Sequence, residues 1–367
     1  MNRMNTGQLI DTAAALMGDG KGLLAIDESN ATCNQRFAAL GIPQTPDLRR
    51  QWRDLIVSAP GLGDSVSGAI LFDETIRQQT DGGKPFAQAL MDAGIIAGIK
   101  VDTGAKELAL HPGEKVTEGL DGLRERLAEY AGMGARFAKW RAVITIGEGM
   151  PGQAAILANA HALARYAALC QEAGLVPIVE PEVLMDGDHT LQRCAQVTEQ
   201  MLHAVFEQMY SAGVLLEGLL LKPAMVVSGL ASTGPASVDD VADATMESFL
   251  RAVPAAVAGV ALLSGGQSGE LASARLNAMN LRCQTRLPWP LTFSFSRAIQ
   301  YPALDIWHGQ QANVVAAQKA LLHRAACNRA ARRGQYSAAM DNQAAPQRAI
   351  ERWENEGGEV PPAAGIS

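Results

Sequence analysis

The stretch ARFAKWRAVI (residues 135–144) is typical of a β-strand, yet it carries two positive charges near its middle. Side chains alternate between the two faces of a strand, so Lys139 and Arg141 share one face, with Phe137 beneath them. Two cations that lie side by side are costly to bury, and we therefore expect carboxylates opposite them.

The next strand candidate, GLVPIVEPE (residues 174–182), contains suitable carboxylates. Glu180 and Glu182 lie two residues apart, so they also share one face of their strand. If the two strands are neighbours, Arg141 can pair with a glutamate, and Lys139 is then available for chemistry.

Lys222 is the residue best suited to covalent chemistry. It follows the very apolar run LEGLLL, and Pro223 ends the predicted strand. A lysine amine in such surroundings can attack a carbonyl carbon and form a Schiff base. The alternative, which composition alone slightly favours, is a lysine whose stem leads to solvent at the end of a strand.

Polar side chains or glycines follow most of the other strand candidates. They are Asp27, Lys100, Asp102, Ser264, Gly265, Gly266 and Arg297. Such positions are often solvated boundary residues, but matched parity on six strands favours a common functional cleft. The Ser-Gly-Gly turn offers backbone amides that can bind phosphate, and a plain strand–helix turn is the alternative interpretation.

Eight short apolar segments predict strands, and segments between several of them, such as residues 154–174 and 190–213, have helical spacing. The strand candidates are residues 21–27, 65–72, 95–102, 135–144, 174–182, 213–223, 259–266 and 291–297. Alternating strands and helices indicate an α/β fold with a parallel sheet, and eight units predict a (β/α)8 TIM barrel. The strand ends would then meet at one mouth, where active sites lie. An open doubly wound sheet is disfavoured because no GxGxxG motif follows the first strand.

The overall charge of the chain excludes some classes of partner. The 367 residues have a formal net charge of −7, which gives no general attraction to nucleic acid or to an anionic membrane. No apolar run is long enough to span a membrane, and the five cysteines form no CxxC pair. We expect reduced thiols in a cytoplasmic protein. We also expect no metal site, because LMDGDHT, around His189, is better explained as a turn.

The composition changes towards the end of the chain. Large apolar residues become few after about residue 325, and the last residues are rich in Gly and Pro. We expect residues 1–330 to form a single barrel domain, and residues 331–367 to form a surface segment with a mobile, flexible tail.

Several segments resemble, in content and order, the signatures of class I (Schiff-base) fructose-1,6-bisphosphate aldolase, most of all its bacterial or photosynthetic members. They are KGLLAIDESNATCNQRFAALGI, GIKVDTG, ARFAKWR, VPIVEPE, LEGLLLKP, LSGGQS and LTFSFSRA. The resemblance runs across nearly the whole chain. It implies an aldehyde-lyase that reversibly cleaves fructose 1,6-bisphosphate into dihydroxyacetone phosphate and glyceraldehyde 3-phosphate. The imine of this class replaces the zinc ion of the other aldolase class, so no metal or other cofactor is implied.

The resemblance also implies a role for each residue of the site. Lys222 would form the Schiff base, and Glu180, assisted by Lys139, would act as acid and base in its formation. Asp27 would accept the proton of the C4 hydroxyl. The residues that would orient these groups are Glu182 and Arg141. Those that would hold the C1 phosphate are Ser264, Gly265, Gly266 and Arg297. Those expected towards the C6 phosphate are Ser29, Thr32, Arg36 and Lys100, with Trp289 in a phosphate-side loop.

The chain departs from the family's usual residues around both phosphates. Gln35 and Thr103 stand where many members have lysine, which removes positive charge near the C6 end. Phe295 and Ser296 replace the more usual Tyr-Gly before Arg297, and Ser296 could shift the phosphate cradle slightly.

Two further interpretations remain open at this stage. The enzyme could prefer a sister substrate, such as sedoheptulose 1,7-bisphosphate or fructose 1-phosphate. It could instead be a non-catalytic scaffold, although a scaffold needs none of the pairings among Asp27, Lys139, Glu180 and Lys222. The expected partner is a phosphorylated sugar, with no nucleic acid and no membrane, and the family resemblance implies a homo-oligomer, either a tetramer or a dimer.

Overall fold

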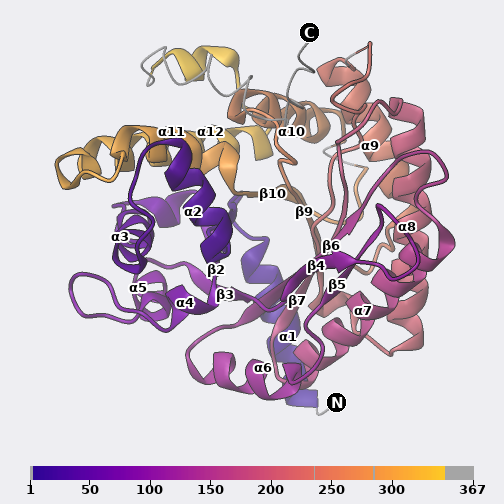
Figure 1. The fold of residues 1–367 in the computed structure, drawn as a ribbon, viewed down its shortest axis with the longest axis horizontal. Helices are drawn as coiled ribbons and strands as arrows, with labels where there is room; N and C mark the ends of the chain where they lie inside the picture. Colours follow the sequence, from indigo (N-terminus) through magenta and orange to yellow (C-terminus); the bar gives the residue numbers. More distant parts are fainter. Residues whose placement is uncertain (1–2, 235, 284–285, 344–367) are drawn as a thin grey trace, which may run out of the picture.

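Eight parallel strands close into a barrel with helices around it (Figure 1). The computed structural model describes residues 3–234, 236–283 and 286–343. The barrel strands are β1 (Gly22–Ala25), β2 (Val66–Leu71), β3 (Ile96–Lys100), β6 (Phe137–Ile144), β7 (Val176–Val183), β8 (Leu220–Leu221), β9 (Gly259–Leu262) and β10 (Leu291–Phe295). Each strand overlaps a segment that the sequence predicts, and they pair in chain order around the ring. The TIM-barrel prediction is therefore confirmed.

The helices pack around the outside of the barrel. They are α1 (Arg3–Leu16), α2 (Asn30–Ala39), α3 (Pro46–Val57), α4 (Asp73–Ile76), α5 (Phe86–Asp92), α6 (Leu123–Gly132), α7 (Gln153–Glu172), α8 (Leu191–Ser211), α9 (Val238–Ala252), α10 (Gly269–Cys283), α11 (Arg297–Trp307) and α12 (Val314–Arg332). The two long helices predicted from their spacing, α7 and α8, begin and end within two residues of the expected bounds. A large cluster of buried apolar side chains fills the space between strands and helices.

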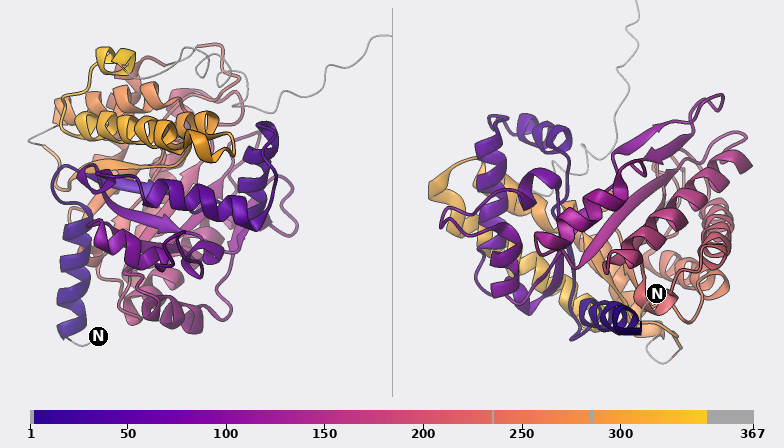
Figure 2. Two further views of the ribbon diagram at one scale, coloured as in Figure 1. Left: turned by 90° about the vertical axis from the view of Figure 1, so that its left-hand side faces the viewer. Right: turned by 90° about the horizontal axis from the view of Figure 1, so that it is seen from below.

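A second, smaller apolar cluster fills the inside of the barrel. Leu9, Ala13 and Leu16 of α1 pack against Phe137 and Ile178, which point inward from β6 and β7. Helix α1 therefore closes one end of the barrel, and it lies at the edge of the molecule in both views of Figure 2.

The strand parity that the sequence indicates is visible in these inner layers. Phe137 and Ile178 lie in the apolar interior, and the charged Lys139 and Glu180 follow two residues later on the same two strands. Gly98 of β3 leaves room for the ring of Phe137, because a Cβ atom at that glycine would lie 2.2 Å from it. An apolar floor thus supports a charged layer at the carboxyl ends of the strands.

The structure corrects the expected strand at residues 213–223. Only Leu220–Leu221 pair as a strand, and Leu216–Gly218 form a 3-10 turn instead. The side-chain amide of Gln171 takes the backbone partners that a longer strand would need. Its Nε2 atom donates to the carbonyl of Leu215 at 2.8 Å, and its Oε1 atom accepts from the Leu215 amide at 2.9 Å.

Two features outside the barrel complete the described chain. Strands β4 (Gly104–Glu107) and β5 (Lys115–Glu118) form an antiparallel hairpin that the sequence did not predict. A 3-10 helix, η4 (Ala338–Gln343), is held by an ion pair between Asp341 and Arg324 of α12. The start of the predicted surface segment thus packs on the barrel domain, and residues 344–367 of the predicted tail lie outside the described residues.

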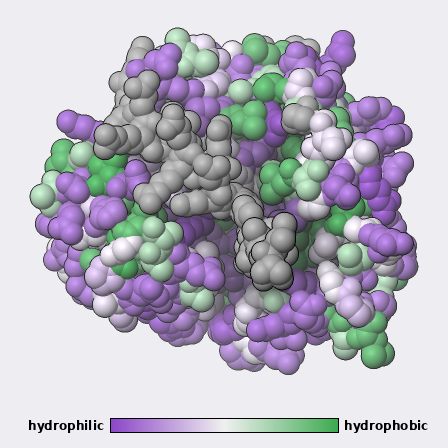
Figure 3. Space-filling view, turned by 45° about the horizontal axis from the view of Figure 1, so that its top comes forward, coloured by the Kyte–Doolittle hydropathy of each residue, from purple (hydrophilic) through white to green (hydrophobic). Residues whose placement is uncertain are grey.

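The surface has no dominant apolar patch on the face drawn in Figure 3, where hydrophobic side chains are scattered in small groups among hydrophilic ones. Among the residues described, no helix combines the length and the apolar character that crossing a membrane requires. All five cysteines are free thiols, and four of them are buried.

Candidate active site

A cavity of about 1060 Å³ opens where the barrel strands end. The wall contains residues from the carboxyl ends of all eight barrel strands, so the mouth expected from the sequence exists. The predicted site residues that line it are Asp27, Ser29, Thr32, Arg36, Lys100, Lys139, Arg141, Glu180, Glu182, Lys222, Ser264, Gly265, Gly266 and Arg297.

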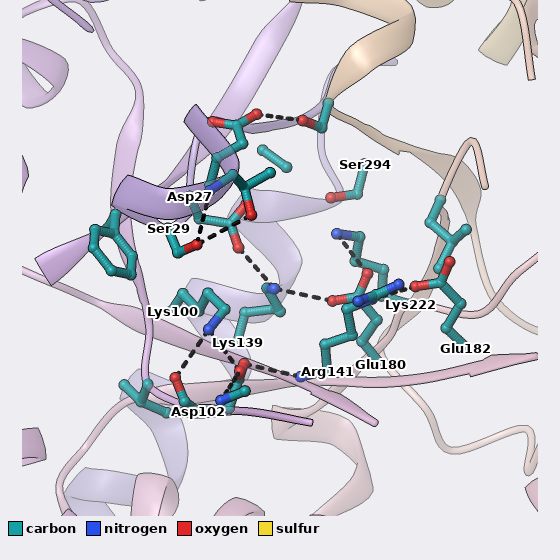
Figure 4. A pocket seen from close by; sticks show the side chains of 18 of the residues that line it. Asp27, Ser29, Lys100, Asp102, Lys139, Arg141, Glu180, Glu182, Lys222 and Ser294 are labelled. Atoms are coloured by element: carbon teal, nitrogen blue, oxygen red, sulfur yellow. Dashed lines mark hydrogen bonds and ion pairs between the residues drawn. The ribbon is translucent and has the colours of Figure 1, made fainter. Parts of the chain in front are cut away.

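Lys139 occupies the centre of the charged layer (Figure 4). Its Nζ atom lies 2.7 Å from Oδ2 of Asp27 and 3.1 Å from Oε2 of Glu180. Asp27 follows β1 and Glu180 belongs to β7, so the curvature of the closed barrel is what brings these two carboxylates to one lysine. All three side chains are almost completely buried.

Lys222, directly after β8, points into the same cluster (Figure 4). Its Nζ atom lies 2.9 Å from Oε1 of Glu180, and the lysine side chain is only 5% exposed. The alternative of a solvated lysine at a strand end is therefore wrong. Glu180 contacts one lysine with each of its two oxygens.

The charges in this cluster stabilise one another. Burial alone would raise the pKa of Glu180, but Lys139, Lys222 and Arg141 lower it to about 2. Burial alone would lower the pKa of Lys139, but Asp27 and Glu180 raise it well above its usual range. Glu180 is thus held as a carboxylate and Lys139 as an ammonium, since each ionic form has buried partners of opposite sign.

The outer part of the charged layer contains two more ion pairs. The guanidinium of Arg141 pairs with Glu182, as expected from neighbouring strands, and β6 and β7 are indeed paired. The Nζ atom of Lys100 lies 2.6 Å from Oδ1 of Asp102, and Asp102 also accepts from the backbone amide of Arg141 at 3.2 Å. These pairs fix the cations around the central cluster.

The Ser264–Gly266 turn and Arg297 lie together on one side of the cavity. Gly266 has a φ of 94°, and a Cβ atom there would lie 3.1 Å from Nη2 of Arg297. Glycine is therefore needed both for the backbone conformation and for the approach of the arginine. Burial lowers the pKa of Arg297, and the nearby positive charge of Arg36 lowers it further, so an anion is favoured between them.

The first turn of α2 lies on another part of the wall. Ser29 caps this helix, accepting from the backbone amide of Thr32 at 3.2 Å, and the two hydroxyl oxygens are 3.0 Å apart. Arg36, one turn further along, pairs with Glu28 at 2.5 Å. A helix N-terminus beside an arginine favours a phosphate group.

One sequence prediction of a site residue is wrong. Trp289 does not line the cavity; it is 2% exposed and packs edge-on against Phe249, with ring centroids 6.4 Å apart. Its segment precedes β10, at the opposite end of the strand from Arg297, so the barrel itself separates the two.

Sequence reasoning missed several residues that line the cavity. Ser294 is buried with a hydroxyl that has no partner among the described residues, and it points into the site in Figure 4. Thr292 and Ser294 lie two residues apart in the strand LTFSF, so they share one face of it. This polar face is the sequence pattern that could have indicated Ser294. Glu28, which directly precedes the predicted site residue Ser29, lines the cavity as well. Ser296, which the sequence indicated only as a change next to the phosphate cradle, also lies in the wall.

The sequence predicts no metal site, and the described side chains that come closest to forming one lie outside the cavity. In the described parts of the chain, the His, Cys and acidic side chains close enough to share an ion are His323, Cys327 and Asp341. Asp341 is already bound there by Arg324 and by the hydroxyl of Tyr336. LMDGDHT forms no such group.

These features define a class of protein: a barrel enzyme whose buried lysine, held by a carboxylate, can form an imine with a carbonyl substrate. Comparisons with known proteins agree with it. Residues 8–354 match the family described as class-I fructose-bisphosphate aldolase. A probable fructose-bisphosphate aldolase class 1 of Xanthomonas campestris pv. campestris is 53% identical over 91% of this chain and 99% of its own. The chloroplastic fructose-bisphosphate aldolase 3 of Arabidopsis thaliana is 48% identical over 92% of this chain and 85% of its own.

A solved structure supports the same assignment. The fructose-bisphosphate aldolase of Plasmodium falciparum, crystallised with TRAP and a small-molecule inhibitor, is 45% identical and superimposes with a TM-score of 0.90. The superposition covers 92% of this chain and 97% of the Plasmodium falciparum chain. The chain belongs to the class I fructose-bisphosphate aldolase family.

The family membership establishes the reaction. The protein is an aldehyde-lyase that reversibly cleaves fructose 1,6-bisphosphate, a phosphorylated sugar, through a lysine Schiff base. Class I chemistry needs no metal cofactor, because a protonated imine withdraws electrons in place of a Lewis-acidic ion. The names of these relatives refer to fructose bisphosphate and give no support to a preference for sedoheptulose 1,7-bisphosphate or fructose 1-phosphate.

Proposed function

We propose that Lys222 is the nucleophile of the aldolase and that Glu180 transfers protons during formation of the Schiff base. The observation that carries this assignment is the position of Glu180, whose two oxygens contact Lys222 at 2.9 Å and Lys139 at 3.1 Å. A general acid or base must lie within hydrogen-bond reach of the proton it moves, and Glu180 is within reach of the Lys222 amine.

The charge around Glu180 changes as the reaction proceeds. The amine of Lys222 attacks the C2 carbonyl of the ketose and forms a carbinolamine, which no longer carries the positive charge of the ammonium. One of the cations that lower the pKa of Glu180 is then lost, so its pKa rises. Glu180 can therefore hold the proton that it takes from the Lys222 amine and donate it to the hydroxyl group of the carbinolamine, which leaves as water.

Asp27 is suited to the cleavage step. It would accept the proton of the C4 hydroxyl while the C3–C4 bond breaks and its electron pair moves into the protonated imine. Glyceraldehyde 3-phosphate leaves, and an enamine remains on Lys222, to be protonated at C3 and hydrolysed to dihydroxyacetone phosphate. Lys139, 2.7 Å from Asp27, keeps this carboxylate oriented.

The two phosphates would bind on separate parts of the wall. The Ser264–Gly266 turn and Arg297 would hold the C1 phosphate, with Glu182 and Arg141 orienting the reacting groups between. The C6 phosphate would lie towards the first turn of α2 and Lys100. The residues of α2 that would contact it are Ser29, Thr32 and Arg36.

Trapping of the imine tests the assignment. The protein is incubated with dihydroxyacetone phosphate and reduced with borohydride, and the labelled peptide is identified by mass spectrometry. We expect the label on Lys222, and slower labelling in Glu180→Gln. The matched control is Glu172→Gln, an exposed carboxylate that pairs with Arg124 on the surface. A label on another lysine would overturn the assignment.

The remaining expectations concern the protein as a whole. We propose a cytoplasmic homo-oligomer, a tetramer or a dimer, on the strength of the family resemblance, and light scattering after size-exclusion chromatography measures its mass. We also propose that residues 1–330 form the barrel domain and residues 331–367 an appended segment. The contacts of Tyr336 and Asp341 with Asn277 and Arg324 support the docking of its first part.

A further inference from the structure

Glu28 is a buried carboxylate in the wall of the cavity that the proposed reaction does not use. It directly follows Asp27, and its side chain is 5% exposed. Its Oε1 atom accepts from three side chains, and its Oε2 atom pairs with Arg53 at 2.7 Å. The three donors to Oε1 are Nη1 of Arg36 at 2.5 Å, Oγ of Ser296 at 2.6 Å and Nε2 of Gln300 at 2.7 Å.

The two arginines differ in what else they can reach. The side chain of Arg53 is 3% exposed, so it is committed to Glu28. The side chain of Arg36 is 18% exposed and lines the cavity, so it can also contact a ligand. A bound phosphate near α2 therefore competes with the Glu28 carboxylate for the same guanidinium.

Glu28 is a strong competitor because it remains charged. Burial alone would raise its pKa, but Arg36 and Arg53, followed by the hydroxyl of Ser296, lower the pKa far below its usual range. The Glu28 carboxylate is therefore already bound to Arg36 as an anion before any substrate arrives.

Ser296 and Gln300 determine what happens when Arg36 leaves. Both keep donating to Oε1 of Glu28, and Gln300 is itself held by the carbonyl of Ala25 at 2.6 Å. The Oε1 atom of Glu28 then keeps two hydrogen-bond donors, and the positive charge of Arg53 stays beside Oε2, so the buried carboxylate is not left without partners. The family resemblance places a glycine at this position, and the hydroxyl of Ser296 is a donor that a glycine could not supply.

We propose that Arg36 exchanges between Glu28 and the C6 phosphate of the substrate, and that Ser296 is a positioning residue that lowers the free-energy cost of this exchange. The proposal rests on the placement of the C6 phosphate given above. Fructose 1-phosphate has no C6 phosphate and leaves Arg36 on Glu28. Glu28 and Ser296 therefore change the affinity for the bisphosphate but not that for the monophosphate. They thereby set the preference of the enzyme for the bisphosphate over the monophosphate.

Substitutions at the two residues should act in opposite directions. Ser296→Ala removes one donor, so Glu28 holds Arg36 more firmly, and the KM for fructose 1,6-bisphosphate should rise at least threefold relative to that for fructose 1-phosphate. Ser296→Thr keeps a hydroxyl and should stay near wild type. Glu28→Gln removes the competing charge, and the same KM ratio should fall at least threefold. In the Glu28→Gln background, Ser296→Ala should have no further effect.

A binding measurement separates this proposal from the proposed function. Calorimetric titration with inorganic phosphate needs no turnover, and it should give a higher Kd for Ser296→Ala and a lower Kd for Glu28→Gln than for wild type. If wild type fails to cleave the bisphosphate, the proposed function fails, and the phosphate titration still tests the exchange. If Ser296→Ala changes the KM for both sugar phosphates by the same factor and leaves the Kd for inorganic phosphate unchanged, Ser296 has only a structural role and the exchange is refuted. The serine variants decide the matter even if Glu28→Gln does not fold.

Discussion

The Nζ atom of Lys222 and the Oε1 atom of Glu180 lie 2.9 Å apart in a region almost closed to solvent. The other oxygen of the same carboxylate contacts Lys139 at 3.1 Å. A buried carboxylate between two lysines can hold one amine in position while it exchanges protons with the other. This relationship links the fold directly to imine chemistry, and four predictions follow from it and from its surroundings.

Loss of the central cation should destabilise the protein. Lys139→Ala would leave Asp27 buried without its ion-pair partner, and breaking a buried pair in this way costs about 3–5 kcal/mol. Urea unfolding measures the free energy directly. The control is Lys84→Ala, whose partner Asp92 is exposed, and there we expect a change of about 0–1 kcal/mol. Equal losses in the two variants would contradict the buried-pair argument.

Arg297 should contribute to binding of the phosphate. Charge-assisted hydrogen bonds from arginine to phosphate are geometry-specific, and hydrogen bonds to charged groups contribute about 1.5–3 kcal/mol. Arg297→Ala should therefore raise the KM for fructose 1,6-bisphosphate by roughly tenfold or more. Arg282→Ala, which removes an arginine from the outer surface of α10, serves as the control. A KM within twofold of wild type, roughly 0.4 kcal/mol, would show that Arg297 does not hold the phosphate.

Activity should not depend on a metal ion. The imine supplies the electron withdrawal that a zinc ion would otherwise provide. Extended dialysis against EDTA should leave kcat for cleavage of fructose 1,6-bisphosphate unchanged, with the metal content checked by mass spectrometry. A loss of activity that zinc or cobalt restores would overturn the Schiff-base mechanism for this chain.

Acid should destabilise the protein partly through Glu180. Its pKa falls from the ordinary value of 4.5 to about 2 in the folded protein, because Lys139, Lys222 and Arg141 outweigh the effect of burial. A lowered pKa means that the stabilisation is present above pH 4.5 and is lost as the pH falls towards 2.

The pH dependence of unfolding measures this contribution. One group can change the free energy of unfolding by at most about 1.4 kcal/mol per pH unit. In Glu180→Gln the slope between pH 4.5 and pH 2 should be smaller than in wild type, whatever the absolute stability of the variant. Identical slopes would mean that folding does not lower the pKa of Glu180.

Local patterns were sufficient to predict the strands and the face on which their charged residues lie. Short apolar runs followed by charge, at a period of two, identify strands buried on both sides with polar carboxyl ends. That is why the eight strands, the shared face of Lys139 and Arg141, and the mouth could be predicted. The pattern failed where a distant side chain intervened: Gln171 shortens β8 by binding the backbone of Leu215.

The choice of partners within the site was decided by the tertiary structure alone. The register of β6 and β7 places Arg141 opposite Glu180. Arg141 nevertheless pairs with Glu182 and Lys139 with Glu180, so each cation contacts the glutamate two residues beyond its register partner. Asp27 reaches Lys139 only because closure of the barrel brings the end of β1 across the mouth. Glu28 meets Ser296 for a similar reason, since β1 and β10 are neighbours only in the closed ring. Spacing along a chain determines which face a side chain occupies, whereas contacts between distant segments depend on register and closure, which no local pattern specifies.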